Sequence, residues 1–292
     1  VCVESVAWIS EQKNTLSTVL YLSAALAYLH FDLHRRPKQF AFASGIFLLA
    51  LLTKTVTATL PAALLVVLWW QRGRLGWRRE VLPLSLWFAL GVGSGLVSAY
   101  FERALIGASG ADFALTALQR FLLAGRIFWF YLGKLVWPAD LTFIYPRWGI
   151  DVGALRQWAF PLGAIVLLAA LVVLATRHAR RGPLAAALLF GGTLFPVLGF
   201  VAVFPFLFSY VADHFQYLAS LGIFALAGAG LTRGFARLPR GGVRTVTAAL
   251  LVALGVLTWG QSRMYRDLFT LYGTTLERNP ACWMAHQNLA VA

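Results

Sequence analysis

Long apolar runs are the feature that most constrains the fold of this chain. Six of them come close to the roughly 20 residues that a helix needs to cross the ~30 Å of hydrocarbon in a bilayer. They are Thr15–Phe31, Val81–Phe101, Phe160–Thr176, Leu184–Phe204, Phe215–Leu231 and Val243–Gly260. Only 12% of the 292 residues are charged and 60% are hydrophobic, whereas a soluble domain has about 25% charged residues. We therefore expect a polytopic membrane protein.

A seventh apolar run, Phe40–Gln71, is too long for one crossing, because its 32 residues would form a helix of ~48 Å. Lys54 interrupts this run, and Pro61 cannot lie in a helix interior without removing a hydrogen bond. We expect a hairpin of two short helices with Lys54 near its tip. Together with the six runs, this predicts an all-α bundle of about eight spans or half-spans.

Basic residues between the runs predict the orientation. Four clusters, at His34–Lys38, Arg72–Arg79, Arg177–Arg181 and Arg233–Arg244, hold 14 of the 25 Lys and Arg, and only two of the 11 acids, Asp32 and Glu80, lie beside them. Lys and Arg concentrate in cytoplasmic loops of membrane proteins. The net charge of +14 is therefore expected to set topology in the lipid bilayer, and we expect no nucleic-acid partner.

Counting crossings from those clusters places Lys54 and the Asp213-His214 pair on the outer side. The stretch Thr116–Trp137 must then begin and end outside, so we expect it to lie in the membrane interface or to re-enter. Its basic residues fall on one face at helical spacing; they are Arg120, Arg126 and Lys134.

No cofactor or metal is expected from the sequence. Cys2 and Cys282 lie at opposite ends of the chain, and Asp213 with His214 lacks a third ligand. No glycine-rich phosphate loop indicates a nucleotide.

The polar tail after Gly260 carries two helical patterns that meet at Asn279-Pro280, the second beginning at Trp283. Tyr272 and the Asn288–Ala290 trio fit positions of a 34-residue tetratricopeptide repeat. We therefore divide the chain into a membrane module, residues 1–262, and the start of an extracytoplasmic repeat solenoid, residues 263–292. A lone repeat cannot bury its apolar face, so further repeats are expected after Ala292.

Membrane spans followed by such a repeat form a specific combination, and several segments add to it: Val3–Ile9, Leu51–Lys54, Trp137–Trp148 and Ala212–Leu218. The chain resembles the transmembrane and tetratricopeptide-repeat glycosyltransferases, relatives of the protein O-mannosyltransferases in the GT-C superfamily of lipid-linked-sugar transferases.

The resemblance implies transfer of a sugar from a polyprenyl-phosphate carrier to a protein or other surface acceptor, at the outer face of a bacterial inner membrane. The repeats would recruit the acceptor. Such enzymes carry an essential aspartate after their first span, which would precede Val1. We therefore expect a fragment of an enzyme, inactive by itself, in which Glu4 is the tail of the catalytic loop.

The chemistry needs a carboxylate for the acceptor hydroxyl and cations for the leaving phosphate. Glu4 is the candidate carboxylate, with a solvated loop acid or helix-start acid as the alternative. Lys54 is the candidate phosphate ligand, with a lysine that snorkels from a helix end as the alternative. Arg126 is a second candidate cation, which could instead serve lipid headgroups. The substrate-binding candidates are Asp213, His214, Arg147, Tyr145 and Trp148, with Asp213 alternatively a helix cap.

Two other functions stay open. A non-catalytic membrane anchor could present the repeats as a scaffold. A lipid-linked glycan transporter would place polar groups inside several spans, and because the span interiors here lack acids, we rank it below the enzyme.

Overall fold

The computed structural model describes residues 1–108, 110, 113–236 and 238–291, and over these residues the fold is all helical, without a strand. Arg237, from the fourth basic cluster, and Ala292 lie outside the described residues. The helices are α1 (Glu4–Ala7), α2 (Gln12–His34), α3 (Pro37–Thr53), α4 (Leu60–Arg72), α5 (Leu82–Phe101), α6 (Ala117–Val136), α7 (Leu155–Arg177), α8 (Arg181–Leu194), α9 (Ser220–Phe235), α10 (Arg240–Ser262), α11 (Leu268–Arg278) and α12 (Trp283–Val291).

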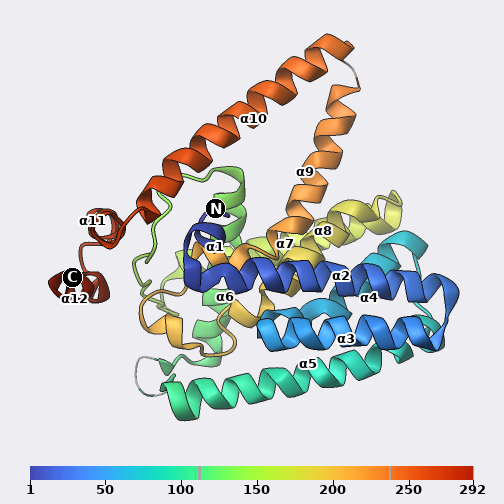
Figure 1. Ribbon diagram of the computed structural model, residues 1–292, viewed down its shortest axis with the longest axis horizontal. Coiled ribbons are helices and arrows are strands. Elements are labelled where there is room, and N and C mark those ends of the chain that lie inside the picture. Colours follow the sequence, from blue (N-terminus) through green and yellow to red (C-terminus); the bar gives the residue numbers. More distant parts are fainter. Residues whose placement is uncertain (109, 111–112, 237, 292) are drawn as a thin grey trace.

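Helices α2 to α5 lie side by side (Figure 1). The turn from α2 to α3 uses Arg35 in a left-handed conformation (φ 56°) and Pro37 in the first turn of α3. The backbone becomes extended at Lys54, a 3-10 helix follows at Thr55–Thr59, and α4 begins with Pro61 in its first turn. Proline is tolerated there because that N–H needs no helical partner. The predicted hairpin with Lys54 at its tip is present.

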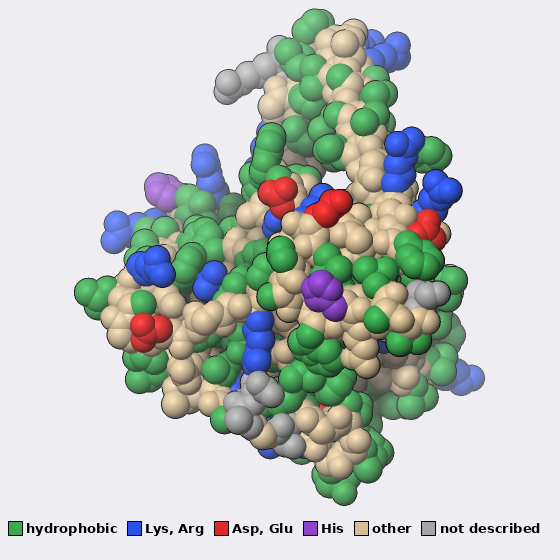
Figure 2. All heavy atoms as spheres, turned by 90° about the vertical axis from the view of Figure 1, so that its left-hand side faces the viewer, with side chains coloured by type: hydrophobic (Ala, Val, Ile, Leu, Met, Phe, Trp, Pro, Cys, Tyr) green, Lys and Arg blue, Asp and Glu red, His purple; other side chains and the backbone are tan. Residues whose placement is uncertain are grey.

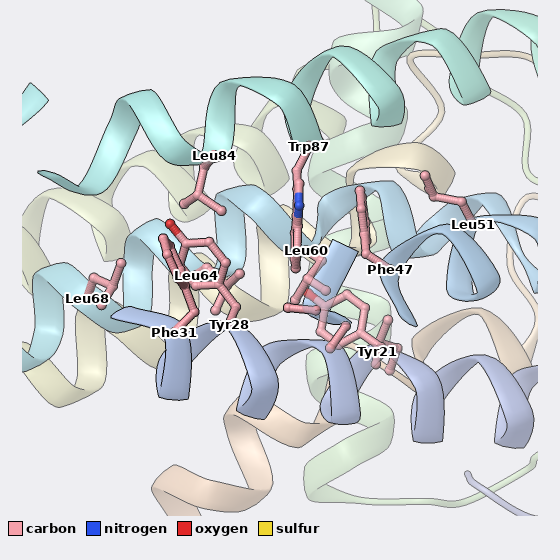
Figure 3. Close-up of a cluster of buried hydrophobic side chains, with 13 residues drawn as sticks. Tyr21, Tyr28, Phe31, Phe47, Leu51, Leu60, Leu64, Leu68, Leu84 and Trp87 are labelled. Atoms are coloured by element: carbon pink, nitrogen blue, oxygen red, sulfur yellow. The ribbon is translucent and has the colours of Figure 1, made fainter. Parts of the chain in front are cut away.

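Aromatic packing joins α2, α3 and α5 around Trp87 of α5 (Figure 3). Its ring stacks on Phe47 of α3 at a centroid distance of 4.5 Å, and Tyr28 of α2 meets it edge-on at 5.2 Å. Trp87 Nε1 also donates to Ser44 Oγ at 2.8 Å. All three rings are fully buried, so α2, α3 and α5 share one core.

Within the described part of the chain, four helical segments are long and apolar enough to cross a membrane: Ile9–His34, Trp77–Ile106, Leu155–Arg177 and Arg240–Tyr265. Shorter apolar helices cover Pro37–Thr53, Arg181–Val197 and Ser220–Phe235. These lengths are compatible with an integral membrane protein, and the count of about eight crossings stays a prediction.

Two of the predicted spans are wrong as single helices. The run Leu184–Phe204 breaks at Leu194, where α8 ends, because Pro196 and Pro205 cannot continue a helix and Gly199 is left-handed (φ 98°). The run Phe215–Leu231 becomes α-helical only at Ser220. The residues before α9 that include the start of this run, Asp213–Gln216, form a separate 3-10 turn.

The bundle has two polar ends. At one, Arg72 of α4 binds Asp32 near the end of α2. At the same end, the Arg181 guanidinium lies against Gly73 and leaves no room for a side chain there. At the other, Lys54 binds Asn14 near the start of α2. Asn14 and Asp32 are 18 residues apart, which is ~27 Å along a helix and close to the thickness of the hydrocarbon layer. Parts of three predicted cytoplasmic clusters therefore share one end, opposite Lys54.

Helix α6 crosses the Lys54 end of the bundle instead of running along it (Figure 1). Its start contacts the residue 199 region through Arg120, which donates to the Gly199 carbonyl at 2.8 Å. Glu102, just after α5, binds the nearby Phe204 N–H at 2.7 Å. The last turns of α6 reach Ala212 through Tyr131. Because both ends of α6 lie at one end of the bundle, the arrangement fits the predicted interfacial or re-entrant stretch.

Helices α9 and α10 form an open V (Figure 1). The start of α9 packs against α8, where Gly222 lies close to Ala186, and no residue in the apolar window of α10 is buried. Such an apolar, unpacked surface is what a lipid-facing pair of helices presents.

Candidate functional site

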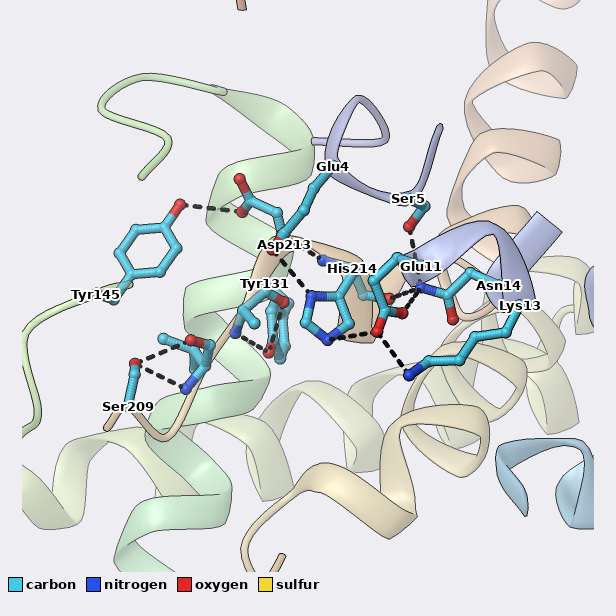
Figure 4. A network of polar contacts seen from close by, with 12 residues as sticks. Glu4, Ser5, Glu11, Lys13, Asn14, Tyr131, Tyr145, Ser209, Asp213 and His214 are labelled. Atoms are coloured by element: carbon cyan, nitrogen blue, oxygen red, sulfur yellow. Dashed lines mark hydrogen bonds and ion pairs between the residues drawn. The ribbon is translucent and has the colours of Figure 1, made fainter. Parts of the chain in front are cut away.

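Four segments far apart in the sequence meet at the Lys54 end of the bundle, and Figure 4 shows the residues of all of them except the turn at Lys54. They are the start of the chain through Asn14, the turn at Lys54, the loop that follows α6, and the 3-10 turn Asp213–Gln216. Their polar side chains form one buried network.

Lys54 enters this network from the end of α3. Its Nζ lies 3.1 Å from Glu11 Oε2 and also donates to Asn14 Oδ1. Glu11 accepts from Asn14 Nδ2 at 2.6 Å and pairs with Lys13 at 3.0 Å. The Lys54 side chain stays 21% exposed. Its ammonium therefore turns into the protein while keeping some access to solvent, unlike the snorkelling alternative.

Glu4 and His214 form the centre of the network. Glu4 Oε2 accepts from the His214 backbone N–H at 2.9 Å, and Glu4 Oε1 lies 3.0 Å from His214 Nδ1. On the other side of the ring, Nε2 is 4.0 Å from Glu11 Oε1. Because Glu4 is only 2% exposed, its alternative as a solvated loop acid is wrong. His214 thus lies between two carboxylates.

Asp213 faces Tyr145, whose hydroxyl donates to Asp213 Oδ1 at 3.0 Å. Burial, helped by the charge of Glu4, raises the pKa of Asp213 from 3.8 to about 7. Burial and the neighbouring Asp213 also raise the pKa of Tyr145. No side-chain cap bond forms at this turn, so the alternative of Asp213 as a helix cap is wrong. Near neutral pH this carboxyl can both give and accept a proton.

Tyr131 of α6 fixes the backbone beside Asp213. Its hydroxyl donates to the Ala212 carbonyl and accepts from the Ala212 N–H, both at 3.1 Å. Tyr131 is fully buried, so this clamp positions the Asp213–Gln216 turn against α6.

Glu11, Asn14 and Tyr131 belong to the network but are missing from the candidates drawn from the sequence. Glu11 and Asn14 lie three residues apart at the polar start of an otherwise apolar helix, which puts them on the same face. That spacing is a signal that could have found them. Tyr131 gives no such signal, because its role depends on a backbone 81 residues away.

The remaining candidates form a second group beside the network. The Arg126 guanidinium lies over the Trp148 ring at 4.2 Å, and that of Arg147 lies over Tyr210 at 5.1 Å. Phe130 contacts both Tyr145, at 4.9 Å, and Trp148, at 5.5 Å. One aromatic ring therefore separates the Arg126 pair from Tyr145.

The C-terminal helices hold the loop that carries Tyr145. Arg278 donates to the Leu141 carbonyl, and Asn279 Nδ2 donates to the Ile144 carbonyl at 3.2 Å. Phe143 of the same loop meets Tyr272 of α11 at 6.2 Å and Trp8 edge-on at 4.9 Å. Helix α12 begins at Trp283, as predicted. The assignment of this helical pair to a tetratricopeptide repeat stays a prediction.

The face of the molecule at this end shows charged side chains scattered among hydrophobic ones, without one continuous charged patch (Figure 2). Among the residues that the structure describes, no three His, Cys, Asp or Glu side chains could hold a metal ion together.

The chain matches no protein-family model, no curated protein and no solved structure. Its function is therefore inferred from the residues themselves.

Proposed function

We propose that the protein is an integral membrane glycosyltransferase that moves a sugar from a polyprenyl-phosphate carrier to a protein or other surface acceptor. The observation that carries this proposal is the contact of Lys54 with Glu11, which lies beside His214, Glu4 and the neighbouring Asp213 at one end of long apolar helices. A phosphate attached to a long hydrocarbon needs a cation at the edge of an apolar surface, and this end of the bundle offers one.

In the transfer, an acceptor hydroxyl attacks the anomeric carbon, the bond from that carbon to the phosphate oxygen breaks, and the carrier phosphate leaves. Lys54 would bind the phosphate, whose negative charge grows as the bond breaks. Asp213, with its pKa raised to about 7, would accept the hydroxyl proton, since a general base works best near the ambient pH. Glu4 would hold His214 beside it.

The second group of residues would bind the sugar. Sugars present an apolar face that packs on aromatic rings, and Trp148 is half-buried with Arg126 over its ring. Arg126 is then the second cation for the carrier phosphate. The C-terminal helices, in contact with the same loop through Arg278, would bring the acceptor to it.

A transporter for a lipid-linked glycan is less well supported. The described segments that could cross a membrane carry their charged residues near their ends. Helix α5, for example, has no charged residue from Leu82 to Phe101, and the charged residues of α7 lie close to its two ends. A path through the membrane for a charged glycan would need polar groups within the spans.

Lys54→Ala, made in the protein expressed from its full gene, tests the proposal. Membranes receive a radiolabelled polyprenyl-phosphate sugar, and transfer to endogenous acceptors is counted. We expect Lys54→Ala to lower transfer by about 100-fold or more, the effect of losing a group that stabilises the leaving charge. The matched control is Lys13→Ala, which removes a lysine from the same carboxylate but from a side chain that is 49% exposed.

Transfer should stay within a few-fold of wild type in the control, and both variants should reach the membrane in equal amounts. Equal transfer by Lys54→Ala and wild type would remove Lys54 from the site. Absence of transfer by the wild type with any polyprenyl-phosphate sugar would favour the membrane-anchored scaffold instead.

A further inference from the structure

The end of the bundle that carries the first two basic clusters is closed by buried ion pairs. Asp32, only 2% exposed, binds the guanidinium groups of both Arg35 and Arg72. Arg72 also lies 2.6 Å from Glu80, and Arg35 donates to the Arg79 carbonyl at 2.9 Å. These bonds tie the ends of α2 and α4 to the turn before α5, so the surface between them has a fixed shape.

An apolar hollow of about 380 Å³ lies beside these ion pairs. One wall comes from the turn between α2 and α3, the other from the first turns of α5, and Arg35 is the one charged residue among those that line it. The apolar lining consists of Phe31, Pro37, Phe40, Leu82, Pro83 and Leu86. Pockets of this volume hold small ligands, and hydrocarbon is the ligand that such a lining suits.

The rim of the hollow is positively charged. Arg36 and Lys38 flank the lining residue Pro37, Arg79 precedes the second wall, and all three are exposed. The two acids of this region, Asp32 and Glu80, pair with Arg35 and Arg72, and Glu80 also lies 3.7 Å from Arg79 Nε, so two acids face five basic residues. An excess of positive charge therefore remains at the mouth of an apolar hollow. The hollow lies at the Asp32 end of α2, where the helix would leave the hydrocarbon layer of the membrane.

We propose that this hollow is a binding site for an anionic phospholipid of the adjoining membrane leaflet. One acyl chain lies between Phe40 and Leu86, and the phosphate headgroup binds Arg36, Lys38 and Arg79. An anionic lipid matches both features, because its chain is apolar and its headgroup carries the net negative charge that a zwitterionic lipid lacks. The site lies at the end of the bundle away from Lys54 and is independent of sugar transfer.

Native mass spectrometry of the detergent-purified protein tests the site, with phosphatidylglycerol and phosphatidylcholine added at equal concentrations. Wild type should retain one phosphatidylglycerol in preference to phosphatidylcholine. Arg36→Gln with Lys38→Gln should weaken that binding about 30-fold, because each basic residue near a headgroup contributes about 1 kcal/mol and a factor of ten is about 1.4 kcal/mol. Leu86→Trp, which fills the hollow, should also lower retention.

The matched control is Arg177→Gln with Arg180→Gln, which removes two exposed positive charges from another basic cluster away from the hollow. It should retain phosphatidylglycerol within about twofold of wild type. An equal loss in the control would mean that basic charge anywhere on this end attracts lipid, and equal retention of the two lipids by wild type would exclude headgroup recognition; either result overturns the proposal. If Leu86→Trp aggregates, the two surface substitutions decide alone.

Discussion

A double-mutant cycle on Glu11 and Lys54 measures the interaction that holds the end of α3 at the start of α2. The two charges are 3.1 Å apart, with the Glu11 side chain 5% exposed and that of Lys54 21% exposed. Breaking a fully buried pair costs about 3–5 kcal/mol. Because Lys54 keeps Asn14 and some solvent, Glu11→Gln should lower the free energy of unfolding by about 2 kcal/mol.

Lys54→Met should cost less, about 1 kcal/mol, because Glu11 keeps Lys13 and Asn14 as partners. The double variant should be more stable than the sum of the two losses predicts, by about 1–2 kcal/mol, as expected for residues in one ion-pair network. The measurement is the free energy of unfolding in mixed detergent micelles for the wild type and the three variants.

A second cycle on Arg266 and Asp267 provides the control. These side chains are 3.8 Å apart but 82% and 44% exposed, so solvent screens their attraction and the two losses should add without measurable coupling. If the Glu11 and Lys54 losses also add to within about 0.5 kcal/mol, the two side chains do not interact, and Lys54 does not occupy the network described above.

Two further predictions concern stability. Burial raises the folded-state pKa of Asp213 from 3.8 to about 7. Between these pH values the folded protein holds a proton on Asp213 that the unfolded chain has lost, so the free energy of unfolding should fall as the pH rises from about 4 to about 7. Unfolding measured across that range should show a smaller fall in Asp213→Asn, and an unchanged fall would exclude Asp213 as its source. On α6, a Cβ at Gly125 would lie 2.5 Å from Pro161 N, so Gly125→Ala should lower the free energy of unfolding by about 1–3 kcal/mol. A Cβ at Gly133 meets nothing within 4 Å, so Gly133→Ala should leave the free energy of unfolding unchanged or raise it. Equal thermal midpoints of the two variants would contradict the close packing of α6 on α7.

Local chemistry made part of the fold predictable. Pro61 and Lys54 interrupt an apolar run that is too long for one span, and the chain turns between them. The helix start at Trp283 follows from Pro280, which cannot continue a helix. In each case a residue type imposes a backbone constraint without help from the rest of the chain.

Apolarity alone did not predict where helices end. The run Leu184–Phe204 is apolar throughout, and hydrophobicity gives no sign that Pro196 starts a series of short turns. The same holds for Phe215, which is apolar but precedes α9. The Asp213 turn was therefore predicted as a helix start, although its backbone is held by Tyr131.

The candidate site was predicted residue by residue but not as a network. Glu4 and His214 are 210 residues apart, and Lys54 meets Glu11 across 43 residues. These contacts depend on how the helices pack, which no local pattern records. Likewise, the basic face of α6 follows from helical spacing, but the ring over which Arg126 lies comes from a distant loop.

Opposite orientation of the two polar ends across the membrane is the central claim, and cysteine labelling in intact cells tests it most directly. Asp151 and Arg180 are exposed and lie just beyond the two ends of α7; each is changed to cysteine in a background where Cys2 and Cys282 are replaced by serine. A membrane-impermeant maleimide should label Asp151→Cys on intact cells and Arg180→Cys only after permeabilisation. Labelling of Arg180→Cys from outside would place the arginine end on the outer face and contradict the account.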